Sequence, residues 1–430
     1  MFPRRVELSS SVLCCDYFFY LLLFLKLFES MKSKSSITRF HNCYILRSGK
    51  IIKEDLWIRD GIIENPEQIF YVEQLEADIT VNCDNLLIAP GFIDIQINGG
   101  CGVDFSYDSD NVQNGIDKVA KKLLEHGVTS FCPTLVTSHP KKYHQILPQI
   151  KKSQGGKHGA SVLGVHLEGP FISLAKKGAH LDEYIKTPEK GIETMCQVYG
   201  SLDNVVIVTL APELPGAIEA IKDLTKHGIK VALGHSTAGL AQGEEAIRHG
   251  ANMITHLFNA MLPFHHRDPG LVGLLASNTE KQVYYGLISD GTHTHPAALR
   301  IACRANPEGL VLVSDAVAAL DLPDGNYRIG PQAVTVKDGR AFITGTDVLC
   351  GSTAALDQCV QTFKKCIECS TEYALEAASL HPARALGIDN KKGKIDFGYD
   401  ADFIIMEPNT LKVLSTWIAG EQVYSVKISK

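Results

Sequence analysis

Four short apolar runs in the middle of this chain each end on a residue that can bind a metal ion or assist one. The runs, each with the residues that follow it, are Val162–Leu167 with Glu168, Lys230–Leu233 with Gly234 and His235, Ala251–Thr255 with His256, and Leu310–Ser314 with Asp315. Parallel α/β barrels place their catalytic side chains at the C-terminal ends of short buried strands. Four such strand ends, contributing Glu, His, His and Asp in order, predict a hydrolytic metal site.

The region around these runs alternates apolar strands with amphipathic helices. Fully apolar strands separated by helices are typical of a parallel sheet covered on both faces. Eight such units over roughly 250 residues predict an α/β fold, a (β/α)8 TIM-like metallohydrolase barrel. An open doubly wound sheet is the alternative, but no GxGxxG follows an early strand. The predicted strands are Phe92–Ile97, Thr129–Cys132, Val162–Leu167, Val205–Leu210, Lys230–Leu233, Met253–Thr255, Val283–Ile288 and Leu310–Ser314.

Both ends of the chain instead carry short strands with alternating polarity and frequent turn residues. Phe40–Leu46 and Ile79–Asn82 represent the first end, and Ile395–Phe397 and Val413–Ile418 the second. Two β-rich ends around an α/β middle predict one small β-sandwich assembled from both. We therefore expect an N-terminal extension over residues 1–37, a β-sandwich domain over residues 38–89 and 395–430, and a catalytic barrel over residues 90–394.

The composition excludes some classes of function. A chain of 430 residues that is 45% hydrophobic can bury a large core. The net charge of −6, without a long Lys/Arg run, argues against a nucleic-acid partner. Twelve cysteines, mostly inside apolar segments, indicate reduced thiols in a cytoplasmic protein. Cys366 and Cys369 form a CxxC without a second pair, which we interpret as helix surface or core, since a structural zinc site takes four ligands.

The N-terminus resembles a signal peptide or a weak anchor, because Arg4 and Arg5 precede the apolar stretch Val12–Phe28. Its uninterrupted part, Tyr17–Leu25, is shorter than the ~20 residues that a membrane-spanning helix needs. Met31 then opens a polar segment that suits a cytosolic start. We expect a dispensable extension and no stable membrane span, with a real signal segment as the alternative.

Glu168, His235 and His256 form the predicted metal site. One carboxylate and two imidazoles, with an open position for water, are a recurrent catalytic zinc set. A metal ion there lowers the pKa of water to near ~7 and polarises a carbonyl. Asp315 can take the proton of the water and then protonate a leaving nitrogen. Hydrogen-bonded core residues and a helix cap at Asp315 are the alternative interpretation, which the shared barrel position disfavours.

The first predicted strand ends in Gln96-Ile97-Asn98, where many barrel metallohydrolases place His-x-His. Amide side chains bind zinc poorly, so we expect one divalent metal ion per subunit, zinc first, with cobalt or iron compatible. His293 follows the seventh strand, so we expect it to face the same rim. Arg267 lies in a Pro/Gly-rich loop, and its guanidinium suits a phosphate or a carboxylate. Taken alone, either residue is better interpreted as an ordinary surface residue.

At these residues the chain resembles the N-acetylglucosamine-6-phosphate deacetylase family of the amidohydrolase superfamily, the animal members above all. The resemblance runs in family order from about Thr38 to the C-terminal strands. It implies a metal-dependent carbon–nitrogen hydrolase of amino-sugar catabolism, which converts N-acetyl-D-glucosamine 6-phosphate to D-glucosamine 6-phosphate and acetate. The matching segments are Pro90–Asp94, Gln96–Gly100, His166–Phe171 (HLEGPF), Gly234–Ser236, Thr255–Met261 (THLFNAM), Asp290–His293 and Ser314–Ala316.

The resemblance also implies roles for individual residues. Glu168, His235 and His256 would hold the metal, and Asp315 would be the acid/base. His293 would help the metal stabilise the oxyanion. The family forms a homodimer in which the Arg267 loop reaches the neighbouring subunit's site. Two features depart from the family pattern: the thiol of Cys350 and the extension before Met31. The residues implied to line the amino-sugar phosphate pocket are Ala179, Asn259, Ala260, Arg267, Asp290, Gly291, Thr292, His293, Leu349, Cys350 and Gly351.

Two other functions fit a barrel of this kind. One is a different cyclic amidase or deacetylase, and the Gln96-x-Asn98 pair argues against the two-metal members of that class. The other is a non-enzymatic scaffold, which would have lost metal ligands that are all present here. Metal analysis of the purified protein separates the scaffold from the enzymes.

Overall fold

The computed structural model describes residues 36–108, 111–329 and 332–426. The apolar stretch Val12–Phe28 and the expected start at Met31 lie outside these residues. Within them, no helix has both the length and the apolar composition that crossing a membrane requires.

The predicted barrel is present. Its eight main strands pair in parallel in sequence order, which places their carboxyl ends at one rim. The strands are β8 (Phe92–Ile97), β11 (Val128–Val136), β13 (Val165–Glu168), β14 (Val205–Leu210), β15 (Lys230–Leu233), β16 (Met253–Ile254), β17 (Tyr284–Ile288) and β18 (Leu310–Val313). The predicted strand Val162–Leu167 is split at Gly164 (φ 138°) into β12 (Ser161–Val162) and β13.

The barrel closes between its first and last strands. The backbone N–H of Asp315 donates to the carbonyl of Gln96 (2.9 Å), and the N–H of Asn98 donates to the carbonyl of Ala316 (2.7 Å). The buried carboxylate of Asp94 accepts from the N–H of Ser314 (3.3 Å) and extends the same seam. The closure therefore joins two segments that carry polar residues of the predicted site.

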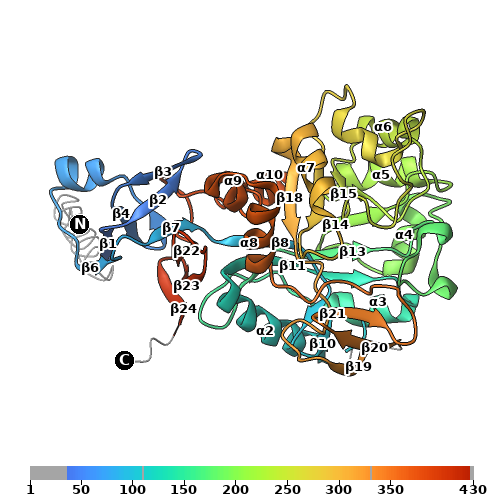
Figure 1. Cartoon of the computed structure of the whole chain (residues 1–430), viewed down its shortest axis with the longest axis horizontal. Coiled ribbons are helices and arrows are strands. Elements are labelled where there is room, and N and C mark those ends of the chain that lie inside the picture. The colour runs from blue at the N-terminus through green and yellow to red at the C-terminus, as the bar shows by residue number, and fades with distance from the viewer. Residues whose placement is uncertain (1–35, 109–110, 330–331, 427–430) are drawn as a thin grey trace, which may run out of the picture.

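Helices surround the sheet (Figure 1). They are α2 (Val112–Leu123), α3 (Pro140–Ile146), α4 (Ile192–Tyr199), α5 (Ala217–Lys226), α6 (Leu240–Arg248), α7 (Pro296–Ala305), α8 (Leu356–Ile367), α9 (Thr371–Glu376) and α10 (Leu380–Leu386). Ala383 and Ala385 of α10 pack against buried residues from several strands, among them Ile93 and Met253. Such a cluster lies inside the barrel, so the interior is a packed core that α10 adjoins.

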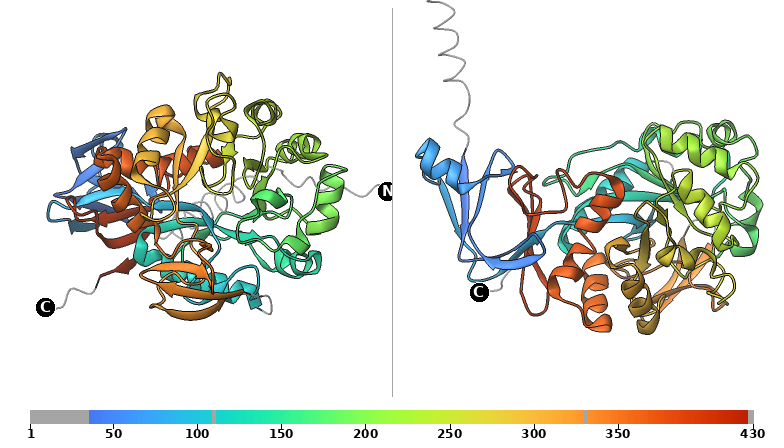
Figure 2. Two further views of the ribbon diagram at one scale, coloured as in Figure 1. Left: turned by 45° about the vertical axis from the view of Figure 1, so that its right-hand side comes forward. Right: turned by 90° about the horizontal axis from the view of Figure 1, so that it is seen from above.

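The two chain ends meet in a small β domain beside the barrel (Figures 1 and 2). Its six-stranded sheet has the order β24-β23-β22-β7-β2-β3, and its four-stranded sheet has the order β5-β4-β1-β6. Phe40 packs edge-on against Phe403 and Trp417 at ring-centroid distances of 5.2 and 4.9 Å, so the two ends share one core. The strands are β1 (Ile37–His41), β2 (Tyr44–Arg47), β3 (Lys50–Lys53), β4 (Leu56–Arg59), β5 (Ile62–Ile63), β6 (Ile79–Asn82), β7 (Leu87–Pro90), β22 (Phe403–Met406), β23 (Val413–Ile418) and β24 (Glu421–Ser425).

Some local predictions were wrong. Phe40–Leu46 is not one strand, because Asn42 takes a left-handed conformation (φ 59°) and separates β1 from β2. Ile395–Phe397 is not a strand; Ile395 fills the β-domain core without joining a sheet. An antiparallel insertion of three strands between β18 and α8 was not predicted: β19 (Gly325–Ile329), β20 (Gln332–Lys337) and β21 (Arg340–Ile343). The residue boundaries of the domains stay a prediction.

Candidate active site

The four residues predicted from the strand ends lie together at the carboxyl rim of the barrel. Glu168 ends β13, while His235, His256 and Asp315 each come two residues after their strand. All four are at most 9% exposed. The three that follow their strands have positive φ angles of 47°, 26° and 46°. Non-glycine residues rarely adopt this region, and such strained positions concentrate at functional sites.

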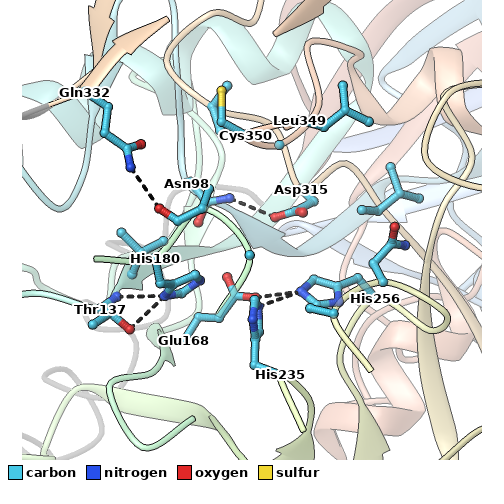
Figure 3. A pocket seen from close by; sticks show the side chains of 18 of the residues that line it. Asn98, Thr137, Glu168, His180, His235, His256, Asp315, Gln332, Leu349 and Cys350 are labelled. Atoms are coloured by element: carbon cyan, nitrogen blue, oxygen red, sulfur yellow. Dashed lines mark hydrogen bonds and ion pairs between the residues drawn. The ribbon is translucent and has the colours of Figure 1, made fainter. Parts of the chain in front are cut away.

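The predicted metal ligands point at one another (Figure 3). Glu168 Oε1 lies 2.9 Å from His256 Nε2 and 3.2 Å from His235 Nε2, and the two Nε2 atoms are 3.0 Å apart. Ligand atoms around one tetrahedral zinc ion, each about 2.1 Å from it, lie about 3.4 Å from each other. The three atoms are therefore gathered almost as they would be around a single ion.

Protonation in the site also suits a cation. His235 Nδ1 lies 2.8 Å from the carbonyl oxygen of Lys176, which can only accept, so Nδ1 carries the proton and Nε2 offers its lone pair. Burial opposes the charge of Glu168, but its bonds to His235 and His256 hold its pKa well below the ordinary value. Burial lowers the pKa of His256, but the bond to Glu168 and its charge raise that pKa to about 9, so His256 would release a proton on binding a divalent metal ion.

A residue that the sequence analysis missed completes this cluster. A side-chain nitrogen of His180 lies within 4.8 Å of the ligand atoms of Glu168 and His235. The backbone N–H of Thr137 donates to Nδ1 of His180 (3.3 Å), so the neutral ring carries its proton on Nε2. Burial lowers the pKa of His180 to about 3, which keeps the ring neutral. His180 directly follows the predicted pocket residue Ala179, and that neighbourhood was the available signal.

Asp315 lies beside the metal ligands with an environment that suits an acid/base. Its Oδ1 accepts from Asn98 Nδ2 at 2.8 Å and from Gln96 Nε2 at 3.3 Å. Burial, followed by the charge of Glu168, raises the pKa of Asp315 to about 6. A carboxylate with a pKa close to the working pH can both take and return a proton.

A cavity of about 250 Å³ opens over these residues. Seven of the pocket residues implied by the resemblance line it: Ala179, Asn259, Ala260, His293, Leu349, Cys350 and Gly351. The unpredicted insertion also contributes, since Gln332 of β20 donates to the carbonyl of Ala179 (2.9 Å). The thiol of Cys350 is part of the wall, and burial raises its pKa to about 11, so it is a neutral surface at pH 7.

Four of the predicted pocket residues do not line this cavity. Asp290, Gly291 and Thr292 form the turn that holds His293, in which both oxygens of Asp290 accept bonds. Asp290 Oδ2 lies 2.7 Å from Nδ1 of His293. Arg267 is exposed on its loop and does not line the cavity of its own chain.

Known proteins match this chain in sequence and in structure. The model of the amidohydrolase family matches residues 87–425. N-acetylglucosamine-6-phosphate deacetylase from Danio rerio is 54% identical over 91% of this chain and 98% of the relative. The enzyme of that name from Caenorhabditis elegans is 47% identical over 99% of both chains. A Mycobacterium smegmatis deacetylase, solved in complex with N-acetyl-D-glucosamine-6-phosphate, superimposes with a TM-score of 0.77 at 29% identity, covering 91% of this chain and all of that one.

The Caenorhabditis elegans match corrects one expectation. The extension before Met31 was expected to have no counterpart, but an alignment over 99% of the chain includes most of those residues. The same alignment covers the strands of both chain ends as well as the barrel. The chain therefore belongs to the amidohydrolase family, and within it to the N-acetylglucosamine-6-phosphate deacetylases.

Proposed function

We propose that this protein hydrolyses the acetamide of N-acetyl-D-glucosamine 6-phosphate, giving D-glucosamine 6-phosphate and acetate, in amino-sugar catabolism. The observation that carries the proposal is the convergence of Glu168, His235, His256 and Asp315 at one end of the cavity. The similarity to deacetylases of that name, over nearly the whole chain, supports the same substrate.

Glu168, His235 and His256 would hold one divalent metal ion per subunit. Zinc fits this set of one oxygen and two nitrogen ligands, and cobalt and iron are compatible with it. When bound, the ion would supply Lewis acidity toward the acetyl carbonyl and toward water. Gln96 and Asn98 stand where a second metal would need imidazoles, and their N–H groups already serve Glu168 and Asp315.

Asp315 serves as base and then as acid. It takes a proton from the attacking water, and the new bond forms between the water oxygen and the acetyl carbon. It then returns the proton to the amide nitrogen as the carbon–nitrogen bond breaks, which releases a neutral amine and acetic acid. The acid keeps the second proton of the water and loses it to solvent at neutral pH, giving acetate. A pKa of about 6 suits both steps, since the residue is mostly ionised at neutral pH and still holds a proton readily.

His180 and His293 present different groups to the cavity. His180 offers an N–H on Nε2, which suits the negative charge that develops on the carbonyl oxygen. His293 donates from Nδ1 to Asp290, which orients its ring and leaves Nε2 to contact a sugar hydroxyl. We therefore assign the oxyanion contact to His180, in place of the role expected for His293, and leave His293 to hold the sugar.

The phosphate would bind Arg267 of a neighbouring subunit in a homodimer. Arg267 is exposed and does not line its own chain's cavity, which supports this arrangement. The free thiols among the described cysteines support a cytoplasmic location.

Acetate release tests the proposed function. We expect rapid release from N-acetylglucosamine 6-phosphate and very slow release from N-acetylglucosamine, both with the full chain and with the chain from Met31 onward. Release from neither compound by metal-loaded protein would refute the substrate assignment.

A further inference from the structure

The amide side chains of Gln96, on β8, and Asn98, the residue directly after β8, make an arrangement that metal binding does not explain. Asn98 Nδ2 donates to Oδ1 of Asp315 (2.8 Å), and Gln96 Nε2 donates to the same oxygen (3.3 Å) and to Glu168 Oε1 (3.0 Å). Figure 3 shows the Asn98 side chain turned toward Asp315. Among the described residues, the other oxygen, Oδ2, accepts no comparable bond.

The backbone makes this contact rigid. The N–H of Asp315 donates to the carbonyl of Gln96, and the N–H of Asn98 donates to the carbonyl of Ala316. These two bonds lock the end of the first barrel strand to the end of the last. The amide groups are therefore held at a fixed position relative to the carboxylate, as orientation of a reacting group requires.

Asn98 is a costly residue for a merely structural role. It is 7% exposed, and its Oδ1 is buried without a hydrogen-bond partner among the described residues. An unpaired buried oxygen destabilises a fold. An apolar side chain would avoid that cost, so the amide is better explained by what its Nδ2 does for Asp315.

We propose that Asn98 and Gln96 are positioning residues with separate tasks. Asn98 Nδ2 donates to Asp315 and not to a metal ligand. Its bond occupies Oδ1 of Asp315, so that Oδ2 is the oxygen that exchanges the proton. Gln96 bridges the acid/base and the metal ligand Glu168, and so fixes the distance between the two. This inference rests on the proposed function, because it assigns Asp315 the proton transfer.

The test compares Asn98→Ala, Gln96→Ala and a matched control in the full-length metal-loaded enzyme. The control is Asn252→Ala. Like Asn98, Asn252 donates from Nδ2, here to the carbonyl of Ala385 (3.2 Å), and its Oδ1 is buried without a partner among the described residues. Unlike Asn98, it precedes β16 and so lies at the opposite end of that strand from His256. We expect Asn98→Ala to lower kcat by about 100-fold with KM within about threefold. Zinc affinity, measured by equilibrium dialysis without turnover, stays within about threefold in Asn98→Ala and falls by about 10-fold or more in Gln96→Ala.

Several outcomes would overturn the inference. A kcat of Asn98→Ala within threefold of the parent, an equal loss in Asn252→Ala, or a loss of zinc in Asn98→Ala would each refute the task given to Asn98. Unchanged zinc affinity in Gln96→Ala would refute the bridge. The parent enzyme in the same assay distinguishes a failure of the proposed function from a failure of the positioning role. An inactive parent refutes the proposed function. An active parent together with a fully active Asn98→Ala refutes the positioning role.

Discussion

Asp315→Asn should make the metal-free protein more stable while removing most of its activity. Burial and the charge of Glu168 raise the pKa of Asp315 from 3.8 to about 6, so the folded protein disfavours the ionised carboxylate. Asparagine keeps a side-chain oxygen for the bonds from Asn98 and Gln96 and carries no charge. The substitution therefore removes an electrostatic cost without removing the contacts that hold the side chain.

The size of this effect depends on pH in a defined way. Because the folded-state pKa is the higher one, the cost of the charge grows as the pH rises from about 4 to about 6 and is constant above that. A shift from 3.8 to about 6 corresponds to about 3 kcal/mol at pH 7.5 and about 1 kcal/mol at pH 4.5. The stability advantage of Asp315→Asn should thus increase by about 2 kcal/mol between these two pH values.

Urea unfolding of chelator-treated parent and variant at pH 4.5 and pH 7.5 measures this difference. Turnover of the metal-loaded proteins, measured in parallel, should fall by about 1,000-fold or more in the variant, since one residue supplies both proton transfers. The reasoning fails if the stability difference is the same at both pH values. Near-normal turnover of Asp315→Asn would remove the acid/base assignment.

Four further substitutions test other parts of the account. Glu168→Gln should lower zinc affinity in equilibrium dialysis by about 10-fold or more, and unchanged affinity would contradict its role as a ligand. His180→Ala should lower kcat by about 100-fold or more with zinc retained, whereas a change in KM alone would argue against an oxyanion contact. Phe40→Ala deletes a fully buried ring of the β domain. It should lower the free energy of unfolding, measured in urea, by about 3–5 kcal/mol and leave kcat of the folded enzyme unchanged. A parallel loss of kcat would show that the β domain shapes the site. Arg267→Ala should raise KM for the phosphorylated sugar and leave the slow reaction of the unphosphorylated sugar unchanged. An equal loss of activity toward both sugars would refute a phosphate contact.

The barrel could be predicted because most of its strands are short, mainly apolar runs that are buried on both faces. β14, at Val205–Leu210, and β15, at Lys230–Leu233, have the predicted bounds. In a short run, a buried loop residue and a strand residue give the same apolar sequence pattern. Ile395–Phe397 was wrongly predicted as a strand for this reason, since Ile395 is 1% exposed but belongs to no sheet. The insertion had a usable signal, since Asp338-Gly339 between alternating runs is typical of a hairpin turn.

The site was predictable where a residue follows directly from a strand end. Glu168, His235, His256 and Asp315 meet because parallel strands bring their carboxyl ends to one rim. His180 has no such anchor: it lies in a loop, and its contact with Thr137, 43 residues earlier, fixes its place. The task proposed for Arg267 involves a second subunit, so neither the pattern nor the structure of one chain places it in a site.

Metal titration of the chelator-stripped enzyme tests the central claim most directly, because the account requires one ion held by three residues of each subunit. Acetate release from N-acetylglucosamine 6-phosphate should rise linearly with added zinc and level off at one ion per subunit. Activity that levels off at two ions, or that survives complete removal of metal, would contradict a site built from Glu168, His235 and His256 around a single ion.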